Sequence, residues 1–237
     1  MSINPLIILS PILSIIIGLI PVIFFRPNGI IVFVSAIAYF LAIGLKAAIE
    51  FLSSNLISSS PIYLQALFYG SLTAIFEVGL AFLIPLIFHK YFVEYTKRKA
   101  ISYGAMLAFW ENAILIGLAG LINIITLLVL QKYNPTLIQQ AIHLQPILAY
   151  STSQLLPLIG LGALERVDSF LAHASWGSLA YYYLFNKSRK FFLIALLGYG
   201  DALAIIMKYG IISLELGEII LFAISLLAFI VSYKILP

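Results

Sequence analysis

Four ionisable side chains, those of Glu77, Glu111, His173 and Asp201, each lie near the middle of a long apolar segment. A charged side chain at the centre of a bilayer costs about 3 kcal/mol on insertion scales. Carboxylates and an imidazole at that depth can bind a divalent cation, or they can act as a general base on water. These four residues are therefore the candidate functional site.

The composition indicates a membrane protein. Of the 237 residues, 63% are hydrophobic and 9% are charged, and the mean hydropathy is +1.11, whereas a soluble domain carries about 25% charged residues. We expect one integral membrane domain, all-α, over residues 1–237. A net charge of +4 is too small and dispersed to indicate nucleic acid as a partner. The chain has no cysteine, so any metal would be held by carboxylates and histidine.

The apolar segments predict seven membrane spans, because about 20 apolar residues cross the hydrocarbon core. The predicted spans are residues 4–25, 28–51, 63–90, 101–130, 164–186, 191–208 and 213–235. Basic residues at alternate junctions place the N-terminus outside and the C-terminus in the cytoplasm; they are Arg26, Lys97, Arg98, Lys99, Lys187, Arg189, Lys190 and Lys234. The expected protein is a multi-pass helical bundle in the cell membrane, with its site-bearing helices at about 63–208.

Residues 144–163 are the alternative eighth span. Their hydropathy allows a crossing, but insertion would move the basic residues near 187–190 to the outer side. Pro146, Pro157 and the polar run YSTSQ (150–154) also interrupt the segment. We therefore expect a re-entrant or interfacial segment, whose backbone must be satisfied by protein or by a water-filled cavity.

The two glutamates differ in their neighbours along the chain. Glu77 has no opposite charge within one helical turn, so its partner must come from another helix or be a proton. Glu111 lies about ten residues from the basic cluster at 97–99 and is followed by Asn112, which places an amide beside a carboxylate in one turn.

The predicted helices around His173 and Asp201 show how other groups can approach them. At 100° per residue, one polar arc of the fifth span gathers Glu165, Asp168, Ser169, Ala172, His173 and Trp176. Asp201 follows Gly198 and Gly200, whose missing side chains would let another helix or a substrate backbone come close. At about 1.5 Å per residue, the four candidates lie within roughly two turns of the midplane. They can therefore share one cavity.

The same residues carry a family resemblance. AMLAFWENAIL (105–115) resembles the Glu-Asn motif of the PrsW family, and ERVDSFLAHASWGSLAYYY (165–183) resembles the Glu-Arg and downstream histidine motif of the YhfC family. Both are intramembrane metalloprotease families related to the CAAX prenyl endopeptidases and bacteriocin-processing enzymes. The resemblance covers about residues 70–205. Phe76 and the LLGYGD segment (196–201) depart from it, because these families commonly have a second glutamate and a histidine at the two places.

The resemblance implies hydrolysis of a peptide bond in a membrane-embedded or lipidated substrate. Glu77 would activate a water, while Glu111, His173 and Asp201 would face a divalent metal, expected to be zinc, or the oxyanion. Exchange of the two glutamates is left open. Asn112, Glu165 and Arg166 would support these groups or the oxyanion.

Other interpretations fit the same residues. The four groups can form the relay of a proton-coupled transporter or channel, or the chain can be an inactive membrane scaffold of the same fold. Glu77 can be protonated, Asn112 can join two helices, and Glu165 can form a structural ion pair with Arg166. Lys46 of the second span can extend to an interface and receives no role.

Overall fold

The computed structural model describes residues 2–187 and 197–237, and every regular element within them is a helix. Five helices are long and apolar enough to cross a membrane: Pro5–Phe25, Gly29–Ser58, Ile62–Ile87, Lys97–Leu130 and Leu214–Ile235. The prediction of an all-α membrane protein is confirmed at this level. The orientation in the bilayer and the number of spans stay predictions.

The first four of these helices contain the following elements. A 3-10 turn, Pro5–Ile8, leads into α1 (Leu9–Phe25), and α2 follows (Gly29–Ser58). α3 (Ile62–Leu72) and α4 (Gly79–Ile87) are joined without a break by a π-helical segment, Thr73–Val78. α5 (Lys97–Phe109) and α6 (Ala119–Leu130) are joined in the same way by Trp110–Leu118.

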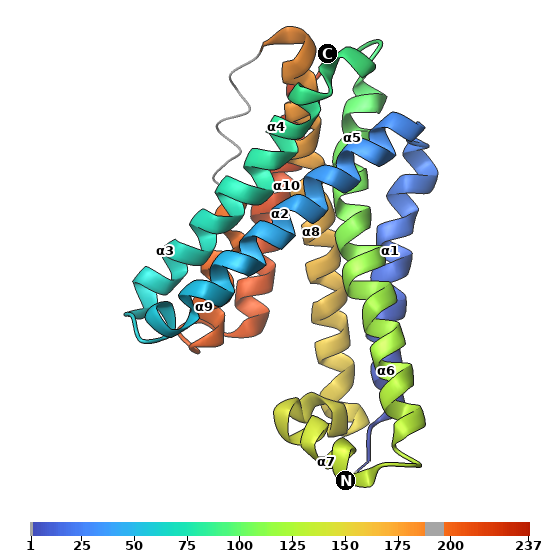
Figure 1. Cartoon of the computed structure of the whole chain (residues 1–237), viewed down its shortest axis with the longest axis vertical. Helices are drawn as coiled ribbons and strands as arrows, with labels where there is room; N and C mark the ends of the chain where they lie inside the picture. The colour runs from blue at the N-terminus through green and yellow to red at the C-terminus, as the bar shows by residue number, and fades with distance from the viewer. Residues whose placement is uncertain (1, 188–196) are drawn as a thin grey trace.

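In the second half of the chain, the described residues form four α-helices. α7 (Pro135–Leu144) is short and amphipathic, α8 (Thr152–Asn186) has 35 residues, α9 (Gly200–Lys208) has nine, and α10 (Leu214–Ile235) ends the chain. In Figure 1, α8 and the continuous α5–α6 helix run along the long axis, while α2 and the α3–α4 helix cross obliquely with α9 near their ends. The two termini lie at opposite ends of the long axis.

Two glycines bring α5 and α8 into backbone contact. A Cβ added to Gly104 would lie 2.6 Å from Ala174 Cα, and one added to Gly177 would lie 2.5 Å from Gly104 Cα. Small residues allow such close helix packing in membranes, where no hydrophobic force draws helices together. Since His173 precedes Ala174, this crossing fixes the depth of the imidazole in the bundle.

The main apolar core surrounds this crossing. It joins α2, α4, α5 and α8 through buried side chains that include Val34, Ile84, Tyr103, Trp176 and Tyr181. A second cluster lies at the opposite end, where α7 covers the N-terminal turn and the start of α8. The core thus holds together the helices that carry the candidate site.

Residues 152–163 do not form the separate segment that we expected. They are the first third of α8. The polar run YSTSQ (150–154), which we expected to interrupt a span, instead contains the N-terminal end of that helix. Ser151 and Gln154 form a capping box there, which satisfies free backbone N–H groups. Pro157 lies in the second turn, where its missing N–H removes a single backbone bond.

The predicted sixth span is only partly described. Residues 191–196 lie outside the described part of the chain, as do Arg189 and Lys190 of the basic junction. The part that is described forms α9, whose nine residues rise about 14 Å. That helix alone is too short to cross a bilayer.

Candidate functional site

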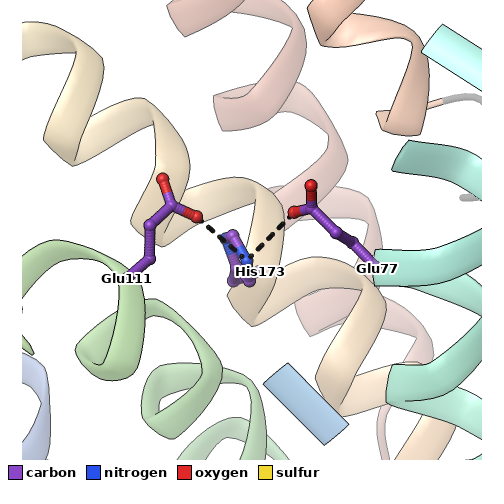
Figure 2. A group of neighbouring side chains, drawn as sticks. All are labelled: Glu77, Glu111 and His173. Carbon is purple, nitrogen blue, oxygen red and sulfur yellow. Dashed lines mark ion pairs between the residues drawn. The ribbon is translucent and has the colours of Figure 1, made fainter. Parts of the chain in front are cut away.

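Three of the four predicted residues converge from three helices. Glu77, Glu111 and His173 each offer one ligand atom, and these atoms lie within 4.8 Å of one another (Figure 2). His173 Nε2 is 3.3 Å from Glu111 Oε2 and 3.9 Å from Glu77 Oε2. The sequence-based grouping of these three residues therefore agrees with the geometry, and the group can hold a metal ion.

Both glutamates lie in π-helical segments. Glu77 belongs to Thr73–Val78, and Glu111 belongs to Trp110–Leu118. A π-helical turn is rare and is frequently found at functional sites, where it inserts a residue and redirects the side chains around it. No signal in the sequence predicted these two turns.

Each carboxylate is anchored by one oxygen and leaves the other facing His173. Arg166 Nη1 and Ser169 Oγ both donate to Glu111 Oε1 at 3.0 Å. Lys46 Nζ donates to Glu77 Oε1 at 2.8 Å, while the Thr73 hydroxyl donates to Asp201. One cation thus holds each glutamate, and the Ser169 hydroxyl also holds Glu111, so the two Oε2 atoms are preorganised toward the same point.

His173 is also held in one orientation. Its Nδ1 lies 2.8 Å from the backbone carbonyl oxygen of Ser169, which can only accept, so Nδ1 carries a proton. In the neutral ring, Nε2 then presents a lone pair to the two glutamates. Nε2 is buried and has no hydrogen-bond partner among the described residues. A histidine whose other nitrogen donates to a carbonyl is the usual arrangement of a metal ligand.

The distances fit a small cation. Two donors held by one zinc ion, at about 2.1 Å and a tetrahedral angle, lie about 3.4 Å apart. The 3.3 Å separation of His173 Nε2 and Glu111 Oε2 matches that value, whereas Glu77 Oε2 at 3.9 Å lies slightly farther out.

Asp201 lies beside this group and has other partners. Its Oδ2 accepts from Lys46 Nζ at 2.5 Å and from Thr73 Oγ1 at 2.7 Å. Asp201 therefore belongs to the anchoring network of Glu77 and not to the three converging donors. Gly198 packs against Ala74, as the small-residue prediction required: an added Cβ would lie 2.4 Å from Ala74 Cα.

Lys46 is a site residue to which we assigned no role from the sequence. It comes from α2 and bridges Glu77 and Asp201, which lie on two other elements. A signal was present, since two acids without a cation within one helical turn require a partner and Lys46 is a lone cation within an apolar span. The expectation that another helix supplies the partner of Glu77 is confirmed.

Arg166 occupies the equivalent place on the side of Glu111. Its guanidinium donates to Glu111 Oε1, to Asn112 Oδ1 at 3.2 Å and to Glu165. Asn112 is fully buried and donates back to the Arg166 carbonyl oxygen at 2.8 Å. Asn112 and Glu165 thus hold the Arg166 guanidinium in one orientation, and Arg166 in turn orients the Glu111 carboxylate.

The ionisable groups leave a net negative charge. The network contains two cations, Lys46 and Arg166. They form ion pairs with four carboxylates, those of Glu77, Glu111, Glu165 and Asp201. With His173 neutral and all four carboxylates ionised, two negative charges are not balanced within the network, although the side chains of Asp201 and Glu165 are 42% and 48% exposed. One divalent cation or two protons would balance them.

All of these groups line one cavity of about 640 Å³. The cavity is walled by apolar side chains of α9, α10 and the Trp110–Leu118 segment, including Leu115, Ile206 and Leu221. Tyr39 also lines it, and its buried hydroxyl has no hydrogen-bond partner among the described residues. The predicted shared cavity is confirmed, and Tyr39 adds a free donor that the sequence did not reveal.

Comparisons of the chain with protein families, with curated proteins and with solved structures find no match.

Proposed function

We propose that this protein is an intramembrane metal-dependent peptidase that cleaves membrane-embedded or lipidated peptides. The observation that carries the proposal is the convergence of Glu77 Oε2, Glu111 Oε2 and His173 Nε2, each fixed by contacts of its other polar atom. The resemblance of the Glu111 and His173 segments to intramembrane metalloproteases supports it. The expected cation is zinc, which accepts mixed carboxylate and imidazole ligands.

The geometry supports separate roles for the two glutamates. Glu111 and His173 are assigned to the cation because their donor atoms have the separation of two ligands of one ion. Glu77 lies farther from His173 and is assigned as the base that takes a proton from the attacking water. A bound cation would lower the pKa of that water and polarise the scissile carbonyl.

Other side chains of the cavity would complete the reaction. The Tyr39 hydroxyl has no partner among the described residues and can donate to the oxyanion. Lys46 would hold the Glu77 carboxylate in orientation before the proton transfer. Glu77 would then return the proton to the leaving amine.

Metal analysis and peptide release from the purified protein test this proposal. We expect about one zinc per chain in the wild type, and loss of the zinc in His173→Ala and Glu111→Gln because a ligand is removed. Glu77→Gln should retain the zinc and lose peptide release. Glu215→Gln, which changes an exposed acid of α10, is the control. A wild type with neither metal nor product would refute the proposal.

A proton relay is the second candidate, because the polar contacts form a continuous chain. They run from Asp201 through Lys46 and Glu77 to His173, and from there through Glu111 to Arg166. A relay predicts proton uptake by liposomes that contain the metal-free protein, with loss in Glu77→Gln. A peptidase predicts no such uptake.

A further inference from the structure

A second acidic pair faces the same cavity without belonging to the triad of Glu77, Glu111 and His173. Asp168 comes from α8 and Glu218 from the second turn of α10, and both line the cavity. The residues are 8% and 5% exposed. Two carboxylates this deeply buried need partners, since burying an unpaired charge is costly.

Among the described residues, no cation forms an ion pair with either acid, and Arg166 is the cation whose charge acts on both from a distance. Asp168 Oδ1 and Glu218 Oε2 are buried without any hydrogen-bond partner there. Ser225 donates to the Asp168 carboxylate, but a hydroxyl carries no charge. Arg166 is the basic residue of the neighbouring turn, and its guanidinium is engaged by Glu111, Asn112 and Glu165.

The geometry argues against a second metal ion. Within the described part of the chain, the donor atoms of Glu77, Glu111 and His173 alone are close enough to share an ion. Glu165, Asp168 and Glu218 are not, although all three line the cavity. An ammonium or guanidinium group can reach separated carboxylates, because its donors point in several directions from a long stem.

We propose that Asp168 and Glu218 form a subsite for a lysine or arginine side chain of the peptide substrate. The proposal rests on the peptidase function, since the subsite and the triad open on the same cavity. A substrate with a basic residue near its cleavage site would supply the missing charge partner. The apolar wall around the pair would accept the methylene stem of that residue.

A binding experiment tests the subsite without requiring cleavage. The protein is the Glu77→Gln variant, and the probes are two acetylated apolar peptide amides. The two peptides have the same sequence except at one position, where one has lysine and the other has norleucine. We expect the lysine peptide to bind at least about tenfold more tightly, because a charge-assisted hydrogen bond forms in a dry site. The preference should disappear in a variant that also carries Asp168→Asn and Glu218→Gln.

A cleavage experiment then connects the subsite to the reaction. Wild type should release product from the lysine peptide with a higher kcat/KM than from the norleucine peptide. Asp168→Asn/Glu218→Gln should lose that difference and still cleave the norleucine peptide. Glu215→Gln on the same helix as Glu218 is the control and should keep the preference.

The outcomes separate the two proposals. Equal binding of the two peptides, or a preference that survives in the acid-free variant, overturns the subsite and leaves the peptidase in place. Such a result would mean that Asp168 and Glu218 are neutralised by protons. Preferential binding of lysine without any cleavage by the wild type refutes the peptidase and retains a cation-binding cavity. The single variants Asp168→Asn and Glu218→Gln, each expected to reduce the preference, serve if the double variant does not fold.

Discussion

Lys46 donates to carboxylates of two other elements, at 2.8 Å to Glu77 and at 2.5 Å to Asp201. Its side chain is 15% exposed and that of Glu77 is 9% exposed, so water screens the pair weakly. Breaking a buried ion pair by removing one partner leaves a charge without compensation. This lysine therefore fixes the direction in which the Glu77 carboxylate points.

Lys46→Met should lower the free energy of unfolding by about 3 kcal/mol, because Glu77 and Asp201 lose their shared cation. It should also slow peptide release, since the proposed base Glu77 is no longer held in orientation. Thermal unfolding in detergent and a peptide-release assay measure the two effects. Lys46→Met combined with Asp201→Asn should recover part of the stability by removing one unpaired acid. Equal stability of Lys46→Met and wild type would show that the pair contributes nothing.

Two different structural features position the three residues of the triad. Glu77 and Glu111 are placed by π-helical turns within continuous helices. His173 is placed by the glycine contact between α5 and α8. The geometry of the triad therefore depends on this helix contact as much as on the three side chains, because a shift of α8 would move His173 Nε2 away from both carboxylates.

Gly177→Leu should prevent α5 and α8 from packing, because even a Cβ at this position would lie 2.5 Å from Gly104 Cα. We expect loss of a monodisperse folded protein, or a fall in unfolding temperature of several degrees, together with loss of zinc. Gly160→Leu on the same helix is the matched control, since no atom lies within 4 Å of a Cβ there. Size-exclusion chromatography and thermal unfolding distinguish the variants. A monodisperse Gly177→Leu variant that retains its zinc would contradict this account.

The whole molecule contains a cavity with ionisable side chains and apolar walls, among helices whose outer surfaces are apolar. Many large apolar side chains are exposed on these helices, including Phe24, Phe51 and Leu227. An exposed apolar surface of this extent suits a bilayer and not water. The two termini lie at opposite ends of the long axis (Figure 1). This arrangement is compatible with the predicted outer N-terminus and cytoplasmic C-terminus.

The absence of cysteine allows a direct test of that orientation. In intact cells, a membrane-impermeant maleimide should label Ser2→Cys and leave Pro237→Cys unlabelled until the membrane is permeabilised. The reason is that basic residues hold the C-terminal side in the cytoplasm. Ser59→Cys, in a predicted outer loop, is the control for access. Labelling of both ends from the same side would require an even number of crossings.

Several features of the fold and the site follow from the sequence alone. Runs of about 20 apolar residues predict membrane helices because the bilayer core has a fixed thickness. Ionisable residues inside such runs predict a buried site because their insertion is costly. Glu77, Glu111 and His173 are therefore identifiable from their positions along the chain. The capping role of Ser151 was also present in the sequence, although we interpreted that segment as an interruption.

The tertiary structure alone decided which atoms meet. No local pattern states that Lys46 reaches across to Glu77, that Asp201 joins Lys46, or that Asp168 and Glu218 remain without a cation among the described residues. These contacts depend on helix rotations set by glycine crossings and by two π-helical turns. A single inserted residue in a helix rotates every later side chain by about 100°, so spacing along the chain cannot predict the facing partners.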